Sequence, residues 1–165
     1  MLAGLLWGLA SAAAAQTAPY ADVQRLIDAR QLDTALQQAD AYLAQRPRDP
    51  QMRFLKGVIQ SGQGQEQAAL DTFTALTQDY PELPEPYNNL AVLHAQRHQL
   101  DQARAALEMA IRLHPRYATA HQNLGDVHGR LALQAYQEAL RLNPDQPELR
   151  ARLSALQAAL NPSPR

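Results

Sequence analysis

Cysteine is absent from the 165 residues of the chain. Within this sequence there can therefore be no disulfide, no thiolate metal ligand, no cysteine nucleophile and no lipid anchor attached through cysteine. The absence is compatible with an oxidising compartment such as a bacterial periplasm, although many proteins of other compartments lack cysteine as well.

Charge of one sign is not concentrated anywhere in the chain. Fifteen basic residues stand against sixteen acidic ones, without a block of like charge, and Lys56 is the only lysine. A surface that binds nucleic acid or anionic lipid needs a basic patch. We therefore expect neither kind of partner.

Motifs of the common enzyme classes are missing too. The chain has no Gly-x-Ser-x-Gly, no glycine-rich phosphate loop and no His-Glu-x-x-His. Its histidines all lie between His94 and His128, and His98 follows His94 by one helical turn. No carboxylate joins them at ligand spacing, so we interpret them as packing and turn residues and predict no metal, no cofactor and no catalysis.

A fixed spacing is the strongest signal that the sequence does contain. Four prolines recur at successive spacings of 34, 34 and 29, and each follows an alanine at a distance of twelve positions: Pro47, Pro81, Pro115 and Pro144. A period near 34 is typical of a stack of helical hairpins, in which each hairpin has an apolar face that only the next one covers.

The second and third units show how such a hairpin forms. In the third unit, apolar residues recur at helical spacing on both sides of a polar break at 96–99. Ala103 lets two helix backbones approach closely, and Leu107 fills the space beyond it. Ala69 and Phe73 repeat this pair in the second unit. The terminal proline then ends the second helix, because it removes a backbone donor and clashes with the preceding turn.

The fourth unit lacks five residues in the region of its turn. Leu124 matches Leu90 at a spacing of 34, whereas Ala139 matches Ala110 of the third unit at a spacing of only 29. Either the turn is tightened around Gly129, or residues 118–142 form one long helix. We favour the long helix, because one apolar stripe runs through the whole stretch.

These features resemble the tetratricopeptide repeat (TPR) family. Its pattern has an aromatic residue early in the first helix, Leu-Gly or Leu-Ala one turn later, a small residue early in the second helix and a terminal proline. The third unit matches with Tyr87, Leu90, Ala91, Ala103 and Pro115. The resemblance implies an all-α superhelix, a solenoid of antiparallel helix pairs, in a TPR domain at 16–161. We expect repeats at about 17–49, 50–83 and 84–117, a shortened repeat at 118–146, a C-terminal capping helix at 147–161 and a disordered tail at 162–165.

The resemblance also implies a binding groove, whose wall is formed by the first helix of each repeat. The expected peptide-binding residues on that wall are Phe54 and Val58 in the second unit, Asn88, Asn89, Val92 and Gln96 in the third, and Gln122, Asn123 and Asp126 in the fourth. In some members, notably the O-linked N-acetylglucosamine transferases and the chaperone-binding adaptors, asparagine at the site of Asn89 and Asn123 binds the backbone of an extended peptide. A carboxamide offers both donors and an acceptor for this task. The alternative is that these asparagines bond within their own stack.

The first fifteen residues are of a different kind. An uncharged apolar run precedes Ser11 and four alanines, which resembles a signal peptide cleaved after Ala15. The run is shorter than the roughly 20 apolar residues that span a bilayer, so we expect no stable membrane insertion. Because the usual positive start is missing, either the true initiator lies upstream of Met1 or the segment is an ordinary alanine-rich helix. A signal peptide predicts a periplasmic or secreted protein, and an ordinary helix predicts a cytoplasmic one.

Together these patterns favour a non-catalytic interaction module or scaffold. It would bind a peptide or protein segment in the groove, in the bacterial cell envelope, as similar small exported repeat proteins of proteobacteria do. The alternative is a self-associating structural protein whose homo-oligomer is the functional unit.

Overall fold

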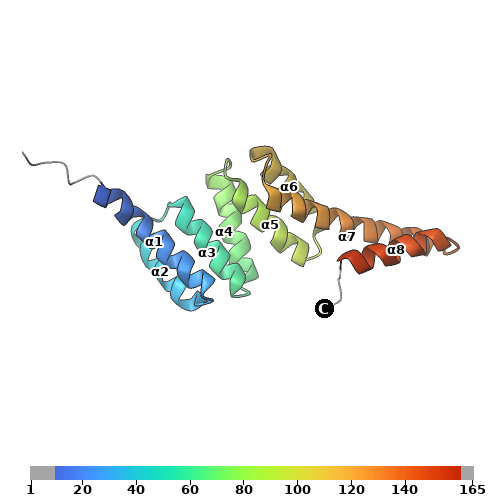
Figure 1. Cartoon of the computed structure of the whole chain (residues 1–165), viewed down its shortest axis with the longest axis horizontal. Coiled ribbons are helices and arrows are strands. Elements are labelled where there is room, and N and C mark those ends of the chain that lie inside the picture. The colour runs from blue at the N-terminus through green and yellow to red at the C-terminus, as the bar shows by residue number, and fades with distance from the viewer. Residues whose placement is uncertain (1–9, 161–165) are drawn as a thin grey trace, which may run out of the picture. The chain divides into compact units, whose positions relative to one another are not determined.

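The structure, a computed structural model, describes the backbone of residues 10–160 and the side chains of residues 19–160. Within this part the protein consists of helices joined by short turns. The chain divides into two compact units, Met1–Pro81 and Glu82–Arg165 (Figure 1). The helices of the first unit are α1 (Ala10–Asp28), α2 (Leu32–Gln45), α3 (Pro50–Gly62) and α4 (Glu66–Asp79). Those of the second are α5 (Pro84–Gln96), α6 (Leu100–Leu113), α7 (Ala118–Leu142) and α8 (Pro147–Leu160). The predicted all-α fold class is confirmed, and the described residues contain no strand.

Proline is the first residue of three described helices, α3, α5 and α8. Pro50 and Pro84 are the first residues of α3 and α5, where the fixed φ of proline suits the first turn and its missing N–H costs nothing. Asp49 caps α3, because its Oδ1 accepts a hydrogen bond of 2.8 Å from the backbone N–H of Met52.

The turns inside the first three helix pairs share one unusual backbone position. Arg30, Gly64 and His98 recur at a spacing of 34 and have φ angles of 58°, 73° and 59°. Glycine adopts a positive φ freely, whereas a residue with a β-carbon does so at a cost. The same turn therefore recurs even where the sequence supplies arginine or histidine.

In the first unit, α3 and α4 approach closely at Gly57. A β-carbon at this position would lie 2.6 Å from Cε1 of Phe73. Phe73 and Ala69, one turn before it, are both fully buried. The predicted use of the pair, alanine for close approach and phenylalanine to fill the space beyond, is confirmed.

A hydrogen-bond network joins α1, α2 and the start of α3. Tyr20 Oη donates to Oδ2 of Asp49 over 2.6 Å, and Tyr42 Oη donates to the same oxygen over 3.2 Å. The pKa of Tyr20 lies above its ordinary value, chiefly because its hydroxyl donates to Asp49. Burial acts to raise the pKa of Asp49, but the hydrogen bonds from Tyr20, from the Met52 N–H and from Tyr42 outweigh it and lower that pKa. The network therefore favours the carboxylate form of Asp49.

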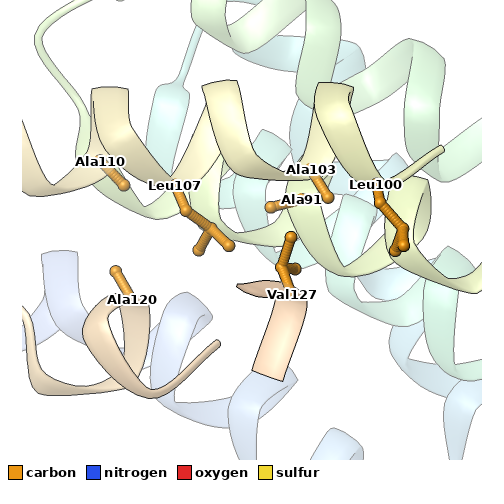
Figure 2. Close-up of a cluster of buried hydrophobic side chains, with 7 residues drawn as sticks. All are labelled: Ala91, Leu100, Ala103, Leu107, Ala110, Ala120 and Val127. Atoms are coloured by element: carbon orange, nitrogen blue, oxygen red, sulfur yellow. The ribbon is translucent and has the colours of Figure 1, made fainter. Parts of the chain in front are cut away.

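A hydrophobic cluster holds α5, α6 and α7 together in the second unit. Figure 2 shows Val127 of α7 pointing toward Leu107 of α6 and Ala91 of α5. Small side chains predominate, which lets the three helices pack closely. The buried members are Ala91, Leu100, Ala103, Leu107, Ala110, Ala120 and Val127.

The longest described helix is α7, which runs without interruption from Ala118 to Leu142. The favoured alternative of one long helix is thus confirmed, and a turn at Gly129 is wrong. Gly129 instead permits a helix contact, because a β-carbon there would lie 3.0 Å from Cδ2 of Leu160 in α8. α8 lies along the second half of α7 (Figure 1), and its leucines are only half-buried.

The predicted signal peptide and disordered tail fall largely outside the described residues, which exclude 1–9 and 161–165. Residues 10–15 belong to the start of α1. Cleavage after Ala15 therefore stays a prediction. None of the described helices combines the length and the apolar character needed to cross a membrane.

Candidate functional site

A hollow of about 180 Å³ opens between α5 and α7 of the second unit. Its floor is apolar and is formed by Ala91 and Ala95 of α5, Leu107 of α6 and Val127 of α7. Its sides are lined by Val92, Gln96, Asn123, Asp126 and Arg130. Three of the four floor residues belong to the cluster of Figure 2, so core packing fixes the position of the floor.

Two alanines account for the depth of the hollow. Ala91 and Ala95 are one turn apart on the same face of α5, where larger residues would fill the space. An engineered apolar cavity of about 150 Å³ is large enough to bind benzene. The hollow therefore has room for one apolar side chain of a partner.

Opposite charges stand on the α7 side of the hollow. Asp126 and Arg130 are one turn apart and exposed, a spacing at which an ion pair is common. The side chain of neither residue forms a hydrogen bond or ion pair with another described residue. Both groups are thus available to a ligand that places an apolar side chain on the floor.

The two asparagines at equivalent repeat positions have different partners. Nδ2 of Asn123 donates to Oδ1 of Asn88 over 2.9 Å, which links α7 to α5. Nδ2 of Asn89 donates to the backbone oxygen of Glu85, one turn earlier in its own helix, also over 2.9 Å. Both side chains therefore have hydrogen-bond partners inside the protein, and peptide binding by them stays a prediction.

The structure brings together four of the nine predicted site residues: Val92, Gln96, Asn123 and Asp126 line the hollow. Asn88, Asn89 and Gln122 belong to the same two helices but not to its lining, and Asn88 is only 6% exposed. Phe54 and Val58 are half-buried on α3 of the first unit. The Phe54 ring lies 5.7 Å from that of Phe73, between ring centroids, so Phe54 contributes to packing there.

Arg130 is the polar residue that the sequence pattern did not reveal. Arg130 follows Asp126 by one helical turn and so lies on the same face of α7. Had the predicted groove been continued along one long helix, Arg130 would have been among its residues. The repeat pattern instead ends the first helix near this point. Ala91 and Leu107 were recognised only as packing residues, and their second use as the floor has no signature in the sequence.

Three of the five histidines contact residues close to them in the chain. His94 Nδ1 lies 2.8 Å from Oε1 of Gln99, and the ring of His114 stacks on that of Tyr117 with centroids 5.6 Å apart. His121 Nε2 lies 2.9 Å from the backbone oxygen of Pro115, which can only accept, so this nitrogen carries the proton. In the described part of the chain, no three histidine, aspartate or glutamate side chains come together at a distance that suits a metal ion.

A comparison with known families agrees with the helix pairs and their spacing. The family model described as tetratricopeptide repeat matches residues 20–84 and 88–147. The chain belongs to the tetratricopeptide repeat family. In TPR terms, α3 and α5 are the first helices of the second and third repeats, and the first half of α7 is that of the fourth.

Individual TPR proteins are similar over part or most of the chain. The chloroplastic tetratricopeptide repeat domain-containing protein PYG7 of Arabidopsis thaliana is 34% identical over 109 residues, which cover 63% of this chain and 32% of the relative. The chain thus spans about a third of that protein. A thermophilic TPR protein of Thermus thermophilus aligns with a TM-score of 0.66 and 26% identity, over 88% of this chain and 82% of that one.

A more distant structural neighbour was solved with a peptide. The type III secretion chaperone SycD of Yersinia enterocolitica, in complex with a peptide of the translocator YopD, aligns with a TM-score of 0.62 and 14% identity. The alignment covers 69% of this chain and 92% of that chain. At this identity the likeness shows the fold alone.

Proposed function

We propose that the protein is a non-catalytic interaction module or scaffold that binds a peptide or protein segment in the hollow between α5 and α7. The observation that carries the proposal is an apolar floor flanked by unpaired polar groups on the first-helix wall of the third and fourth repeats. TPR membership supports it, and so does the peptide bound to SycD. An apolar side chain anchors the segment on the floor, and the polar groups orient its backbone.

Within this proposal, the polar contacts come from groups other than the asparagines of the repeat pattern. A ligand that takes the amide of Asn123 must first break its bond to Asn88, whose buried oxygen would then lack a donor. Leaving a buried polar group unpaired costs about 1–3 kcal/mol. Gln96, Asp126 and Arg130 carry no such cost, so they are the groups that receive the segment.

A peptide selection with a blocked site tests the proposal. Peptides selected from a random displayed library on the full chain should bind wild type and lose binding to Ala95→Phe, which fills the hollow. Ala105→Phe on the exposed face of α6 introduces the same side chain outside the lining and should leave binding unchanged. The proposal is wrong if no peptide is enriched, or if the enriched peptides bind Ala95→Phe as well as wild type.

We also propose that the protein acts in the cell envelope, as a periplasmic or secreted protein whose residues 1–15 are removed. The support is the uncharged apolar run followed by four alanines. N-terminal sequencing of the protein from envelope extracts should begin at Gln16. A chain that keeps its first residues and is recovered with the cytoplasm would contradict export.

A further inference from the structure

The sides of the hollow between α5 and α7 contain two pairs of equivalent repeat positions. Val92 and Asp126 form the first pair, and Gln96 and Arg130 form the second, each at a spacing of 34. The second pair follows the first by one helical turn in both helices. The α7 side of the hollow therefore presents an acidic group at one level and a basic group at the next.

The two charges on this side are separate binding groups. An aspartate four residues before an arginine is a favourable order for an ion pair on a helix. The side chains of Asp126 and Arg130 nevertheless pair neither with each other nor with another described residue. Farther along α7, Arg141 does pair with Glu138, with 2.6 Å between Nη2 and Oε1.

The lining of the hollow has no net charge. Among the described residues that form it, Asp126 and Arg130 are the charged ones. A ligand with a single charge would be attracted by one of these groups and repelled by the other. A ligand that carries both signs in the matching order would be attracted by both, so the site favours a ligand of this kind.

Helix packing does not require either charge. Asp126 and Arg130 are both exposed. The equivalent positions of the second repeat are Val58 and Gly62, which are uncharged. The ordered pair of charges is thus a property of the hollow in the second unit and is not a repeated feature of the fold.

The spacing of the two charges suits an extended segment. Four residues of a helix rise about 6 Å, and two residues of an extended chain rise about 6.6 Å. In an extended chain, the residues before and after a given residue point away from the face that this residue uses. When one apolar side chain occupies the floor, its two neighbours therefore leave the floor at the spacing of Asp126 and Arg130.

We propose that the hollow binds an extended segment of a partner protein in which one apolar residue lies directly between a basic and an acidic residue. This inference rests on the proposed function and names the chemistry of the ligand. The apolar side chain contacts Ala91 and Ala95, the basic residue contacts Asp126, and the acidic residue contacts Arg130. The order of the two charges sets the direction in which the segment runs along α7.

Two versions of one peptide test the charge order. A peptide enriched on wild type is compared with a copy in which the basic and acidic residues beside the apolar anchor are exchanged. Fluorescence anisotropy measures the binding of both to the full chain at low salt. Wild type should bind the original at least about fivefold more tightly, because the exchange turns two attractions into two repulsions. The difference should shrink in 1 M salt, where the screening length is about 3 Å.

Variants with exchanged charges complete the test. Asp126→Arg/Arg130→Asp should reverse the preference, and Asp126→Asn/Arg130→Gln should bind both peptides equally. Glu138→Arg/Arg141→Glu exchanges an ion pair of the same helix outside the lining and should keep the wild-type preference. None of these variants alters the net charge, and circular dichroism checks that each is folded.

The results distinguish this inference from the proposed function. Peptides that need the open hollow, and so do not bind Ala95→Phe, could lack the two charges, carry them at the four-residue spacing of a helix, or bind wild type equally well after the exchange. Each of these results would overturn the charge-ordered segment and leave the hollow as a peptide site. If no enriched peptide needs the open hollow, both the inference and the proposed function are wrong.

Discussion

At the scale of single residues, the backbone at Arg30 and His98 is held in a conformation that glycine adopts more easily. For a residue with a side chain this conformation costs about 1–2 kcal/mol. His98 is exposed, so little packing opposes its replacement. The turn persists because the helices on both sides of it are buried against each other.

We expect His98→Gly to raise the free energy of unfolding by about 0.5–1 kcal/mol, since relief of the strain exceeds the extra freedom of glycine in the unfolded chain. Gly64→Ala should lower it by a similar amount, because Gly64 has a φ of 73°. His128→Gly, in the middle of α7, is the control and should be destabilising. Urea unfolding of the three variants checks the signs, and a destabilised His98→Gly would contradict the argument.

Asp49 gives the first unit a dependence on acid. The pKa of Asp49 is lower in the folded protein than in the unfolded chain, where it is about 3.9. Asp49 therefore stabilises the folded protein above this unfolded-state pKa, and the contribution is lost as the pH falls through the pKa of the folded state. Tyr20→Phe removes the hydrogen bond of 2.6 Å and should cost about 1 kcal/mol at pH 7 and much less near pH 2.

Carboxyl titration by NMR should show the pKa of Asp49 rising in Tyr20→Phe. Tyr136→Phe is the control, because Tyr136 has no hydrogen-bond partner among the described residues. An unchanged pKa of Asp49 in Tyr20→Phe would show that burial and the remaining donors govern this group.

At the scale of elements, α3 and α7 show how the same small residue serves two environments. Gly57 is required, because the Phe73 ring leaves no room for a β-carbon. Gly125 is open, so within one chain its lack of a side chain only weakens the helix. Position in the repeat is the same, and the neighbouring helix makes the difference.

Alanine at these two positions should therefore have opposite effects. We expect Gly57→Ala to lower the free energy of unfolding by about 1–3 kcal/mol, through overpacking against a rigid ring. Gly125→Ala should raise it by about 0.5–1 kcal/mol, through helix propensity. Thermal and urea unfolding measure both, and equal effects would mean that α4 does not hold Phe73 against α3 as described.

The helices could be predicted from the sequence because their packing depends on nearby residues. Ala69, Phe73 and the terminal prolines each act within one hairpin, so a period of 34 carries their arrangement directly. The absence of the fourth turn was equally local, because a continuous apolar stripe favoured one helix at 118–142. What the missing turn leaves uncovered on α7 depends on contacts between helices, which no spacing expresses.

The site was only half predictable, because equivalent positions do not have equivalent neighbours. Asn123 has Asn88 thirty-five residues before it and bonds to that amide. Asn89 bonds to the backbone oxygen of Glu85 in its own helix instead. A motif identifies the asparagine, but not the hydrogen-bond partner that the asparagine finds in the folded chain.

At the scale of the whole molecule, the chain consists of two compact units with separate hydrophobic clusters. One cluster draws on residues between Tyr20 and Ile59, and the other on residues between Tyr87 and Leu131. In repeat proteins, stability is approximately a sum of local terms and neighbour terms. Damage to one cluster should therefore be felt first within its own unit.

Hydrogen exchange should reveal this division. Met52→Ala removes a fully buried side chain of the first cluster, at a cost of about 2–5 kcal/mol, and should speed amide exchange mainly in α1–α4. Leu107→Ala should do the same mainly in α5–α7. Uniform acceleration over the whole chain in both variants would show a single cooperative unit.

The amide pair of Asn88 and Asn123 offers a natural spectroscopic reporter. Held by a partner inside the protein, the Asn123 carboxamide protons should give a resolved pair of NMR signals that exchange slowly with solvent. A ligand that binds beside Ala91 and Ala95 and leaves this hydrogen bond intact would shift the two signals, and the protons would still exchange slowly. A ligand that breaks the hydrogen bond would make the protons exchange fast with water, and their signals would disappear. The same pair of peaks would thus read out both occupancy and the manner of engagement, without any added label.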